Sequence, residues 1–260
     1  MRHLDAVIFA THLFVITREA GHVIMAVYSG GFADIQIKRD QSPVTEADFA
    51  AHGMLQLRLV TFLPECLVVS EEDTESLARR RCRGSFWLID PLDGTEEFIA
   101  HNGEFTVNIA LIEDDRSILG VVSAPAIDVL CWGGAGLGAY RCRDGHTVGI
   151  QVAESNSESL CRVVASKSHL NDQSLIDRLG QVSLLQAGSS LKFCRVTEGA
   201  ADIYPRLAPT CEWDTASAQA VLEAAGGAVV DLHGRPLLYS KLDILNSSFI
   251  ATRDIALIPV

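Results

Sequence analysis

The chain is organised around the stretch Asp90-Pro91-Leu92-Asp93-Gly94-Thr95. Strand-forming residues precede it at Phe86–Ile89, and the segment Glu96–Ile99 behind it can turn as a helix. The spacing predicts a buried strand that bends at its proline and glycine and opens a helical turn at the threonine. The two aspartates, three positions apart, would then point into one small bend.

These two carboxylates need a partner, because burying two unpaired anions side by side is costly. Carboxylate oxygens, together with a main-chain carbonyl freed by the turn, suit a hard ion such as Mg²⁺. The amides of Gly94 and Thr95 at the helix start would face a phosphate oxygen. On these residues alone, an ordinary Asx turn with Asp93 as the helix cap is the better explanation, so the metal hypothesis needs further carboxylates.

Composition limits the classes of protein and partner. The chain has 260 residues, enough for one large domain or two small ones, and its 48% of apolar residues can form a sizeable core. The net charge of -12 argues against binding a nucleic-acid polymer or an anionic membrane through a basic face. Small phosphates stay possible substrates, because a bound metal can invert the local sign of charge.

The cysteines and the apolar runs indicate a cytosolic protein. Seven cysteines occur without a C-x-x-C pair, which predicts reduced thiols, with neither a zinc site nor a disulfide framework. Polar residues interrupt the apolar N-terminal run, and no span approaches the roughly 20 apolar residues of a membrane helix. We therefore expect a cytoplasmic location and no transmembrane segment.

The first part of the chain predicts helices packed on a mostly antiparallel sheet. An amphipathic helix is expected over 4–28, then a polar loop from Lys38 to Pro43, and then a helix over about 46–62. Thr45 is the expected N-cap of this second helix, with Asp48 at its third position. Strands are expected at 67–69, 86–89, 105–112, 118–123, 129–132 and 139–142.

The pattern changes after about residue 155. Strands at 162–165, 182–185 and 228–230 alternate with helices at 173–179, 189–199 and 213–225, as in an α/β layer. The boundary is placed at Asn156–Ser159. Residues 1–155 would form an N-terminal metal-binding α+β region, and residues 156–260 a C-terminal α/β region that completes the active site.

Five acids stand at the edges of buried elements rather than in charged stripes. Taken one at a time, each is best explained as a helix cap or a solvated acid. Taken together they predict a shared pocket for two or three Mg²⁺ ions, which could clamp a phosphate and activate a water. The five are Asp48, Glu71, Asp90, Asp93 and Asp214.

These residues carry a resemblance to a known family. The stretch at 90–95, with Trp213-Asp214-Thr215-Ala216, resembles the paired signature of the inositol monophosphatase superfamily, the Mg²⁺-dependent, lithium-sensitive phosphatases. The stretches 42–48, 70–73, 102–110 and 188–194 are similar to its bacterial branch of CysQ-type 3'(2'),5'-bisphosphate nucleotidases. The resemblance spans nearly the whole chain and implies a mixed α/β fold with the α-β-α-β-α layers of the sugar phosphatases.

The resemblance also implies roles for the acids. Glu71, Asp90, Asp93, Asp214 and the main-chain carbonyl of Leu92 would bind metal. Asp48 would pair with the Thr95 hydroxyl to position the attacking water, beside Glu71 as a further catalytic residue. Leu92, Asp93, Gly94, Thr95 and Asp214 would surround the scissile phosphate.

Substrate contacts are implied at four further positions. Ser189, Lys192 and Arg206 would contact the second phosphate and the nucleotide, and His169 the ribose and base. The structural alternatives are helix capping by Ser189, surface solvation of the two cations and an ordinary loop histidine. A second phosphate does need cationic partners, and arginine suits it by its bidentate geometry. Lys38 is implied as a lid residue that closes over the metals, although alone it would be read as solvated.

Two departures from the family pattern leave substrate preference open. Glu96 stands where lysine is usual after the Gly-Thr pair, which removes a cation near the phosphate. Ser217-Ala218 stands where alanine and glycine are usual, and a larger residue there could crowd the floor of the site.

The leading hypothesis is hydrolysis of the 3'-phosphate of 3'-phosphoadenosine 5'-phosphate, extending to its 5'-phosphosulfate analogue, in support of sulfate assimilation. The alternatives are an inositol monophosphatase or broad sugar phosphatase, and a non-catalytic nucleotide or metal sensor. The expected partner is a small nucleotide bisphosphate, and the expected assembly is a monomer or a weak homodimer. Peripheral association with the inner face of the inner membrane stays open.

Overall fold

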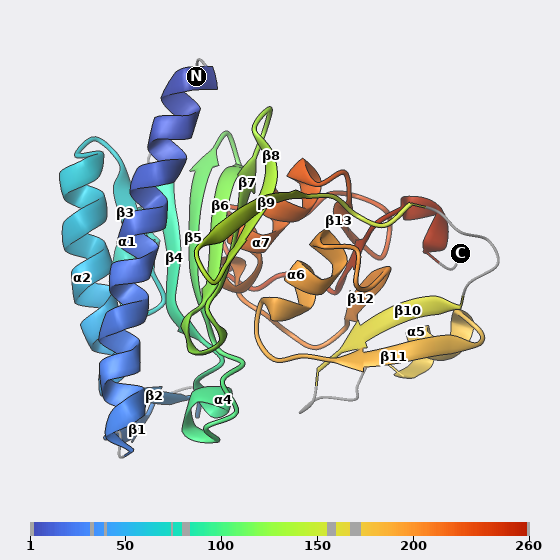
Figure 1. The fold of residues 1–260 in the computed structure, drawn as a ribbon, viewed down its shortest axis with the longest axis horizontal. Coiled ribbons are helices and arrows are strands. Elements are labelled where there is room, and N and C mark those ends of the chain that lie inside the picture. The colour runs from blue at the N-terminus through green and yellow to red at the C-terminus, as the bar shows by residue number, and fades with distance from the viewer. Residues whose placement is uncertain are drawn as a thin grey trace.

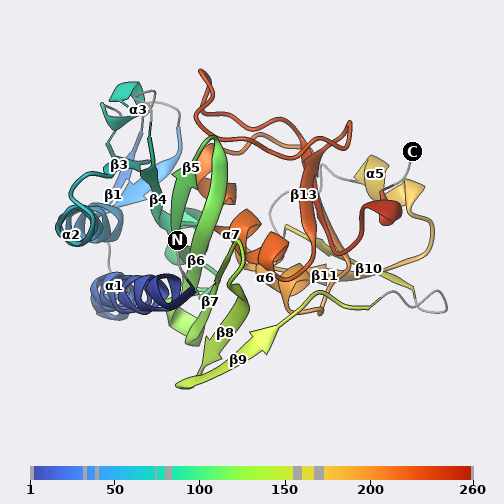
Figure 2. The ribbon, with the colours of Figure 1, turned by 90° about the horizontal axis from the view of Figure 1, so that it is seen from above.

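The computed structural model describes residues 3–31, 34–38, 41–73, 75–79, 84–154, 160–166 and 173–258. Across the molecule, a pair of helices, a sheet, a second pair of helices, a second sheet and an outer short helix follow one another (Figure 1). The same succession is seen from above, where α1 is viewed along its axis (Figure 2). The predicted α-β-α-β-α layers are thus confirmed.

The first sheet has seven strands in the order β3-β4-β5-β6-β7-β8-β9. All neighbours pair antiparallel except β3 and β4, so the prediction of a mostly antiparallel sheet is confirmed. The strands are β3 Leu67–Ser70, β4 Phe86–Asp93, β5 Thr106–Glu113, β6 Arg116–Ala124, β7 Val129–Gly134, β8 Gly138–Arg143 and β9 His146–Ile150.

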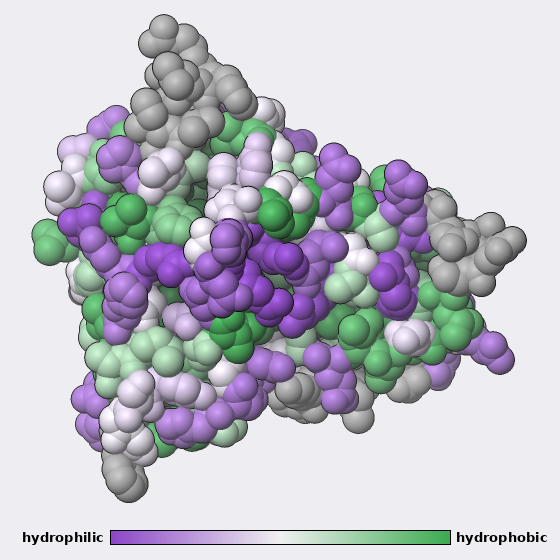
Figure 3. Space-filling model, in the orientation of Figure 1, coloured by the Kyte–Doolittle hydropathy of each residue, from purple (hydrophilic) through white to green (hydrophobic). Residues whose placement is uncertain are grey.

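The edge strand β9 was not predicted. Four of its five residues are exposed, so it lacks the alternation of buried and exposed residues that identifies a strand in a sequence. Polar residues gather across the middle of the molecular face on which β9 lies (Figure 3).

Two long helices, α1 His3–Gly30 and α2 Glu46–Phe62, cover the outer face of this sheet. Leu13 and Ile24 of α1 share one buried cluster with Leu55 of α2 and Trp87 of β4. Short elements complete this half: β1 Ile35–Ile37, β2 Pro43–Thr45, α3 Ser76–Arg79, α4 Thr95–Ile99 and a 3-10 turn at Pro125–Ile127. None of the helices among the described residues is long and apolar enough to span a membrane.

The start of α2 confirms the predicted cap. The Thr45 hydroxyl accepts a hydrogen bond from the Ala47 amide at 3.2 Å, and Asp48 Oδ2 accepts one from the Thr45 amide at 2.8 Å. This reciprocal capping fixes Asp48 at the entry of the helix, where its second oxygen can face another element.

The second sheet has five strands in the order β11-β10-β12-β14-β13. Its strands are β10 Cys161–Ala165, β11 Val182–Gln186, β12 Ile203–Arg206, β13 Ala228–Asp231 and β14 Phe249–Thr252, with α5 Gln173–Arg178 and a 3-10 turn at Ile255–Leu257 outside it. The predicted alternation missed β12 and β14, two short central strands that are almost fully buried. The predicted boundary at Asn156–Ser159 lies outside the described residues, so the division into two regions stays a prediction.

Two helices, α6 Leu191–Thr197 and α7 Glu212–Ala224, lie between the sheets. Ten residues of α7 are buried, so this helix belongs to the core of both layers. It approaches β6 so closely that a Cβ added to Gly120 would overlap the carbonyl oxygen of Ser217. Glycine is needed there because no side chain fits between the helix and the strand.

This contact generates a prediction with a matched control. Gly120→Ala should lower the free energy of unfolding by about 1–3 kcal/mol or more, because the overlap is with rigid backbone. Gly53→Ala should raise it by about 1 kcal/mol, because an added Cβ on this exposed position of α2 meets no atom within 4 Å. Urea denaturation of both variants checks the pair, and equal stabilities would contradict the close approach of α7 and β6.

Candidate functional site

A pocket of about 290 Å³ opens where the end of β4 meets the starts of α4, α6 and α7. Residues from both halves of the chain line it, and three of the five predicted acids, Glu71, Asp93 and Asp214, lie in its wall, whereas Asp48 and Asp90 are not among its lining residues. Predicted site residues in its wall are Glu71, Asp93, Gly94, Thr95, Ser189, Lys192, Arg206 and Asp214.

Asp93 connects the two halves at this pocket. Its Oδ2 accepts hydrogen bonds from the Ser190 amide at 2.7 Å and from the Ser190 hydroxyl at 2.8 Å. The Thr106 hydroxyl at 3.1 Å and the Asn108 amide group at 3.3 Å donate to the same oxygen. Among the described residues, all side-chain hydrogen bonds of Asp93 therefore go to Oδ2, and Oδ1 retains its capacity for another partner.

The main chain strengthens the same junction. The Ser189 hydroxyl donates to the carbonyl oxygen of Asp93 at 2.9 Å, and the Ser190 hydroxyl lies 2.9 Å from the carbonyl oxygen of Asp214. Ser190 is only 2% exposed and is the N-cap residue of α6. The helix-cap alternative for Ser189 is wrong, because its hydroxyl is directed to Asp93.

Asp48 and Thr95 meet as the resemblance implied. Asp48 Oδ2 is used for the cap of α2, and Asp48 Oδ1 accepts a hydrogen bond from the Thr95 hydroxyl at 3.3 Å. The same hydroxyl lies 3.5 Å from the carbonyl oxygen of Leu92. Burial raises the pKa of Asp48, against the lowering effect of the hydrogen bonds from Thr45. The contact is present, and its catalytic role stays a prediction.

The remaining acids form one electrostatic cluster with Asp93. Burial, followed by the charges of Glu71, Asp93 and Asp214, raises the pKa of Asp90 well above its ordinary value. Burial and the charges of Asp93 and Glu71 do the same for the pKa of Asp214. One oxygen of each aspartate is tied to a backbone amide: Leu92 N lies 3.0 Å from Asp90 Oδ1, and Cys211 N lies 2.7 Å from Asp214 Oδ2.

Lys38 reaches this cluster from the chain just after β1. Its Nζ lies 2.7 Å from an oxygen of Glu71 and 2.7 Å from an oxygen of Glu72. Burial alone would lower the pKa of Lys38, but the charges and hydrogen bonds of the two glutamates raise it. The alternative of a simply solvated lysine is therefore wrong, while the lid role of Lys38 stays a prediction.

The donor chemistry of the cluster fits a hard divalent cation. Its groups are carboxylate and carbonyl oxygens, and they raise one another's pKa because like charges are held together away from water. Among the described residues, no group of three or more Asp, Glu, His or Cys side chains is placed so that it could hold a metal ion. The fit therefore rests on the type of donor and on the three carboxylates, Glu71, Asp93 and Asp214, that line the pocket.

The predicted substrate residues also lie together where the structure describes them. Lys192 is 6% exposed, and its Nζ lies 5.5 Å from the centroid of the Tyr204 ring. Burial lowers the pKa of Lys192 to about 8, with Asp93 opposing the shift and Arg206 adding to it. Surface solvation is therefore excluded for Lys192. His169 lies outside the described residues.

The two departures from the family pattern differ in position. Glu96 lines the pocket beside Thr95. Ser217 is fully buried where α7 meets β6 and is absent from the described lining of the pocket, so the structure gives no support to crowding of the floor by this side chain.

The sequence did not identify the residues that donate hydrogen bonds to Asp93. Thr106 and Asn108 occupy alternate positions on β5, and their register places them opposite Asp93 and Asp90. Polar residues on one face of an otherwise apolar strand were the available signal. Ser190 gave no comparable signal, because only the folded chain brings it to β4.

Comparison with known proteins identifies the family. Residues 7–258 match the inositol monophosphatase family. The chain belongs to this family. A curated relative that is 44% identical over 241 residues is the 3'(2'),5'-bisphosphate nucleotidase CysQ of Salmonella typhimurium, with 91% of this chain and 96% of that protein covered. The nucleotidase of the same name from Escherichia coli strain K12 is 44% identical over 238 residues, covering 90% and 95%.

Solved structures agree with this assignment. CysQ from Bacteroides thetaiotaomicron, described as a bacterial member of the inositol monophosphatase family, superposes with a TM-score of 0.80 at 37% identity and covers 94% of this chain and 97% of its own. An IMPase from Thermotoga maritima superposes with a TM-score of 0.77 at 26% identity, covering 97% and 92%. The recognised family and fold are thereby confirmed.

The Ser190 junction generates a stability prediction. Ser190→Ala removes a buried hydroxyl that contacts Asp93, Asp214 and Asn108. It should lower the free energy of unfolding by about 1–3 kcal/mol, because polar partners stay buried without it. Ser248→Ala, which removes one hydrogen bond to the carbonyl oxygen of Leu207, should cost about 1 kcal/mol or less. Chemical denaturation compares the two, and an equal or smaller loss for Ser190→Ala would contradict the junction.

Proposed function

We propose that this member of the inositol monophosphatase family hydrolyses the 3'-phosphate of 3'-phosphoadenosine 5'-phosphate, giving AMP and inorganic phosphate, with Mg²⁺ as cofactor. The observation that carries the proposal is the joint presence of an acid cluster and two cationic side chains, Lys192 and Arg206, in one pocket. The nucleotidases named among the relatives support the same substrate.

The metal would be held by Glu71, Asp90, Asp93, Asp214 and the carbonyl oxygen of Leu92, with two or three ions in the site. When bound, Mg²⁺ neutralises charge on the phosphate and makes a coordinated water a stronger nucleophile at neutral pH. The protein then has to supply positioning, because hydrolysis of a phosphate monoester needs little covalent chemistry from side chains.

Positioning of the water is assigned to Thr95 and Asp48. The Thr95 hydroxyl donates a hydrogen bond to Asp48 Oδ1, so the hydroxyl oxygen of Thr95 can accept a hydrogen bond from the attacking water. In the reaction the water oxygen bonds to phosphorus while the bond from phosphorus to the ribose 3'-oxygen breaks, and a proton passes to that leaving oxygen. Glu71, which also lines the pocket, is the further acid assigned to the water.

Positioning of the scissile phosphate is assigned to the turn at Gly94. This residue has a φ of 90° at the N-cap of α4, a conformation that glycine adopts readily. An added Cβ there would overlap the Ser189 hydroxyl, so the turn also needs glycine for space. The amides of Gly94 and Thr95 would donate to phosphate oxygens between Asp93 and Asp214.

The second phosphate is assigned to Lys192, Arg206 and Ser189. Two cations at the pocket wall of a chain with a net charge of -12 are best explained by an anionic group on the substrate. An inositol monophosphate has only the one phosphate, which the acid cluster and its metals would take. This difference favours a bisphosphate over the inositol alternative, and the intact acid cluster favours an enzyme over a sensor.

Several finer points belong to the same proposal. The 5'-phosphosulfate analogue carries the same 3'-phosphate, and clearing these nucleotides would support sulfate assimilation. The proposed location is the cytoplasm, the proposed state is a monomer or weak homodimer, and His169 is the proposed contact to the ribose and base.

Phosphate release from a panel of substrates tests the function. The nucleotide should be preferred over inositol 1-phosphate, fructose 1,6-bisphosphate and NADP, activity should require Mg²⁺, and submillimolar lithium should inhibit. If the nucleotide were the poorest of the four, the assignment to the nucleotidases would be wrong.

Asp93→Asn should reduce kcat by more than about 100-fold, beyond the usual effect of residues that only support a metal ligand. The physical reason is that the variant loses the negative charge that would face the metal. The matched control is Asp243→Asn, an exposed loop aspartate whose substitution should leave kcat unchanged. Normal turnover of a folded Asp93→Asn variant would refute the metal assignment.

Lys192→Met should raise KM for the bisphosphate nucleotide by roughly 10- to 100-fold, the worth of one charged hydrogen bond. It should change KM for inositol 1-phosphate far less, because that substrate has no second phosphate. Arg195→Met is the control on the same helix, since Arg195 pairs with Glu198 at 2.6 Å instead of lining the pocket. Equal changes for both substrates would count against the subsite.

A further inference from the structure

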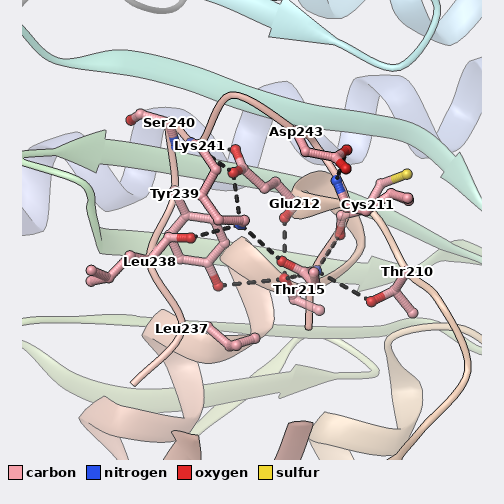
Figure 4. Close-up of polar contacts among 12 residues, drawn as sticks. Thr210, Cys211, Glu212, Thr215, Leu237, Leu238, Tyr239, Ser240, Lys241 and Asp243 are labelled. Carbon is pink, nitrogen blue, oxygen red and sulfur yellow. Dashed lines mark hydrogen bonds and ion pairs between the residues drawn. The ribbon is translucent and has the colours of Figure 1, made fainter. Parts of the chain in front are cut away.

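The loop between β13 and β14 packs against the first turn of α7 (Figure 4). Two apolar side chains of the loop, Leu237 and Tyr239, are buried in clusters shared with α7, whereas Leu238 is 42% exposed, Leu242 80% and Leu245 45%. Where the loop meets the first turn of the helix, polar contacts add to this apolar packing.

Glu212, the first residue of α7, makes three of these contacts with the loop. Its Oε2 accepts a hydrogen bond from the Ser240 amide at 3.1 Å, and its Oε1 accepts one from the Lys241 amide at 3.0 Å. Lys241 Nζ lies 2.8 Å from the same Oε1 (Figure 4). Glu212 is 0% exposed, so this carboxylate is buried against the loop and does not simply complement the helix dipole from solvent.

Asn246 makes the second set of contacts. Its side-chain amide lies 2.7 Å from the carbonyl oxygen of Cys211, 3.0 Å from the Thr215 hydroxyl and 3.2 Å from the Thr210 hydroxyl. Its Oδ1 accepts a hydrogen bond from Lys241 at 3.3 Å, which joins the two sets. Asn246 is 8% exposed, and its own backbone amide donates to the carbonyl oxygen of Thr210 at 2.8 Å.

The segment 210–215 that these contacts fix is the one that carries Asp214 into the pocket. Thr210, Asp214 and Thr215 all line the pocket, and Asp214 Oδ2 is itself bonded to the Cys211 amide. The loop thus contacts the chain on both sides of Asp214: the main chain of residues 210–212 before it and the Thr215 hydroxyl after it. A carboxylate that must stay beside like charges needs such support, because repulsion would otherwise turn it away.

We propose that Glu212 and Asn246 are positioning residues for Asp214, and that the affinity of the site for its divalent cation depends on the loop that they anchor. The inference rests on the proposed metal-dependent function. A loop outside the pocket would thereby influence metal binding indirectly, by fixing the first turn of α7.

Calorimetric titration of the metal-free protein with Mn²⁺ alone, without substrate, tests the inference. Asn246→Ala and Glu212→Ala should each weaken Mn²⁺ binding by roughly 10- to 100-fold. Glu212→Gln, which keeps an acceptor oxygen and the shape, should lose less than Glu212→Ala. The control is Asp243→Ala, which removes an exposed hydrogen bond to the Leu245 amide within the same loop and should bind Mn²⁺ like the wild type.

A kinetic readout separates positioning from general damage. In the Asn246→Ala and Glu212→Ala variants the Mg²⁺ concentration for half-maximal activity should rise, while KM for the nucleotide at saturating Mg²⁺ should stay unchanged. If either alanine variant does not fold, Lys241→Met replaces it, because Lys241 contacts both anchors and is partly exposed. Lys241→Met should weaken Mn²⁺ binding several-fold.

Two outcomes overturn different statements. Folded variants that lose thermal stability but bind Mn²⁺ as tightly as the wild type would overturn the positioning role and leave the anchors purely structural. A wild-type protein that binds no Mn²⁺ would overturn the proposed metal-dependent function itself.

Discussion

The structure depends on one carboxylate oxygen that accepts hydrogen bonds from both halves of the chain. Asp93 Oδ2 receives donors from β5 and from the start of α6, segments that are far apart in the sequence. A carboxylate held by several donors keeps a fixed orientation, and this one is held from one side only. The junction that joins the two halves therefore also presents the second oxygen of Asp93 for another purpose.

In three other aspartates of the acid cluster, too, one carboxylate oxygen bonds to the backbone. Asp48, Asp90 and Asp214 each use one oxygen to fix local backbone: a helix cap, a turn and a helix start. Structure and chemistry are thus served by the same side chains, so neither the helix-cap explanation nor the metal explanation is complete alone. The mutual repulsion of these acids is the electrostatic reason for a cation in the pocket, and Lys38 and Lys192 are two of the described cations whose charges act on its acids.

The sequence predicted those features of the fold that are decided by residues close to one another in the chain. The turn at Gly94 with the helix start at Thr95, the Thr45 cap and the limits of α2 follow from neighbouring residues, and the structure has them. The strand itself runs past the predicted bend at Pro91 to Asp93, with an irregular register after Asp90. The sequence did not predict β9, most of whose residues are exposed, or β12 and β14, which are strands because of their neighbours in the sheet. Thr106, Asn108 and Ser190 were missed for a related reason: strand register and the approach of α6 decide their contacts with Asp93, and neither is visible in local sequence.

The central claim is that Asp93 is oriented by one oxygen so that the other can bind a metal. A crystal structure of the protein with Mn²⁺ and AMP, with anomalous diffraction to locate the ions, tests it most directly. The account predicts that Oδ1 of Asp93 coordinates Mn²⁺ while Oδ2 keeps its hydrogen bonds to Ser190, Thr106 and Asn108. Ions bound away from the acid cluster, or an Asp93 that releases Ser190 to coordinate through Oδ2, would contradict it.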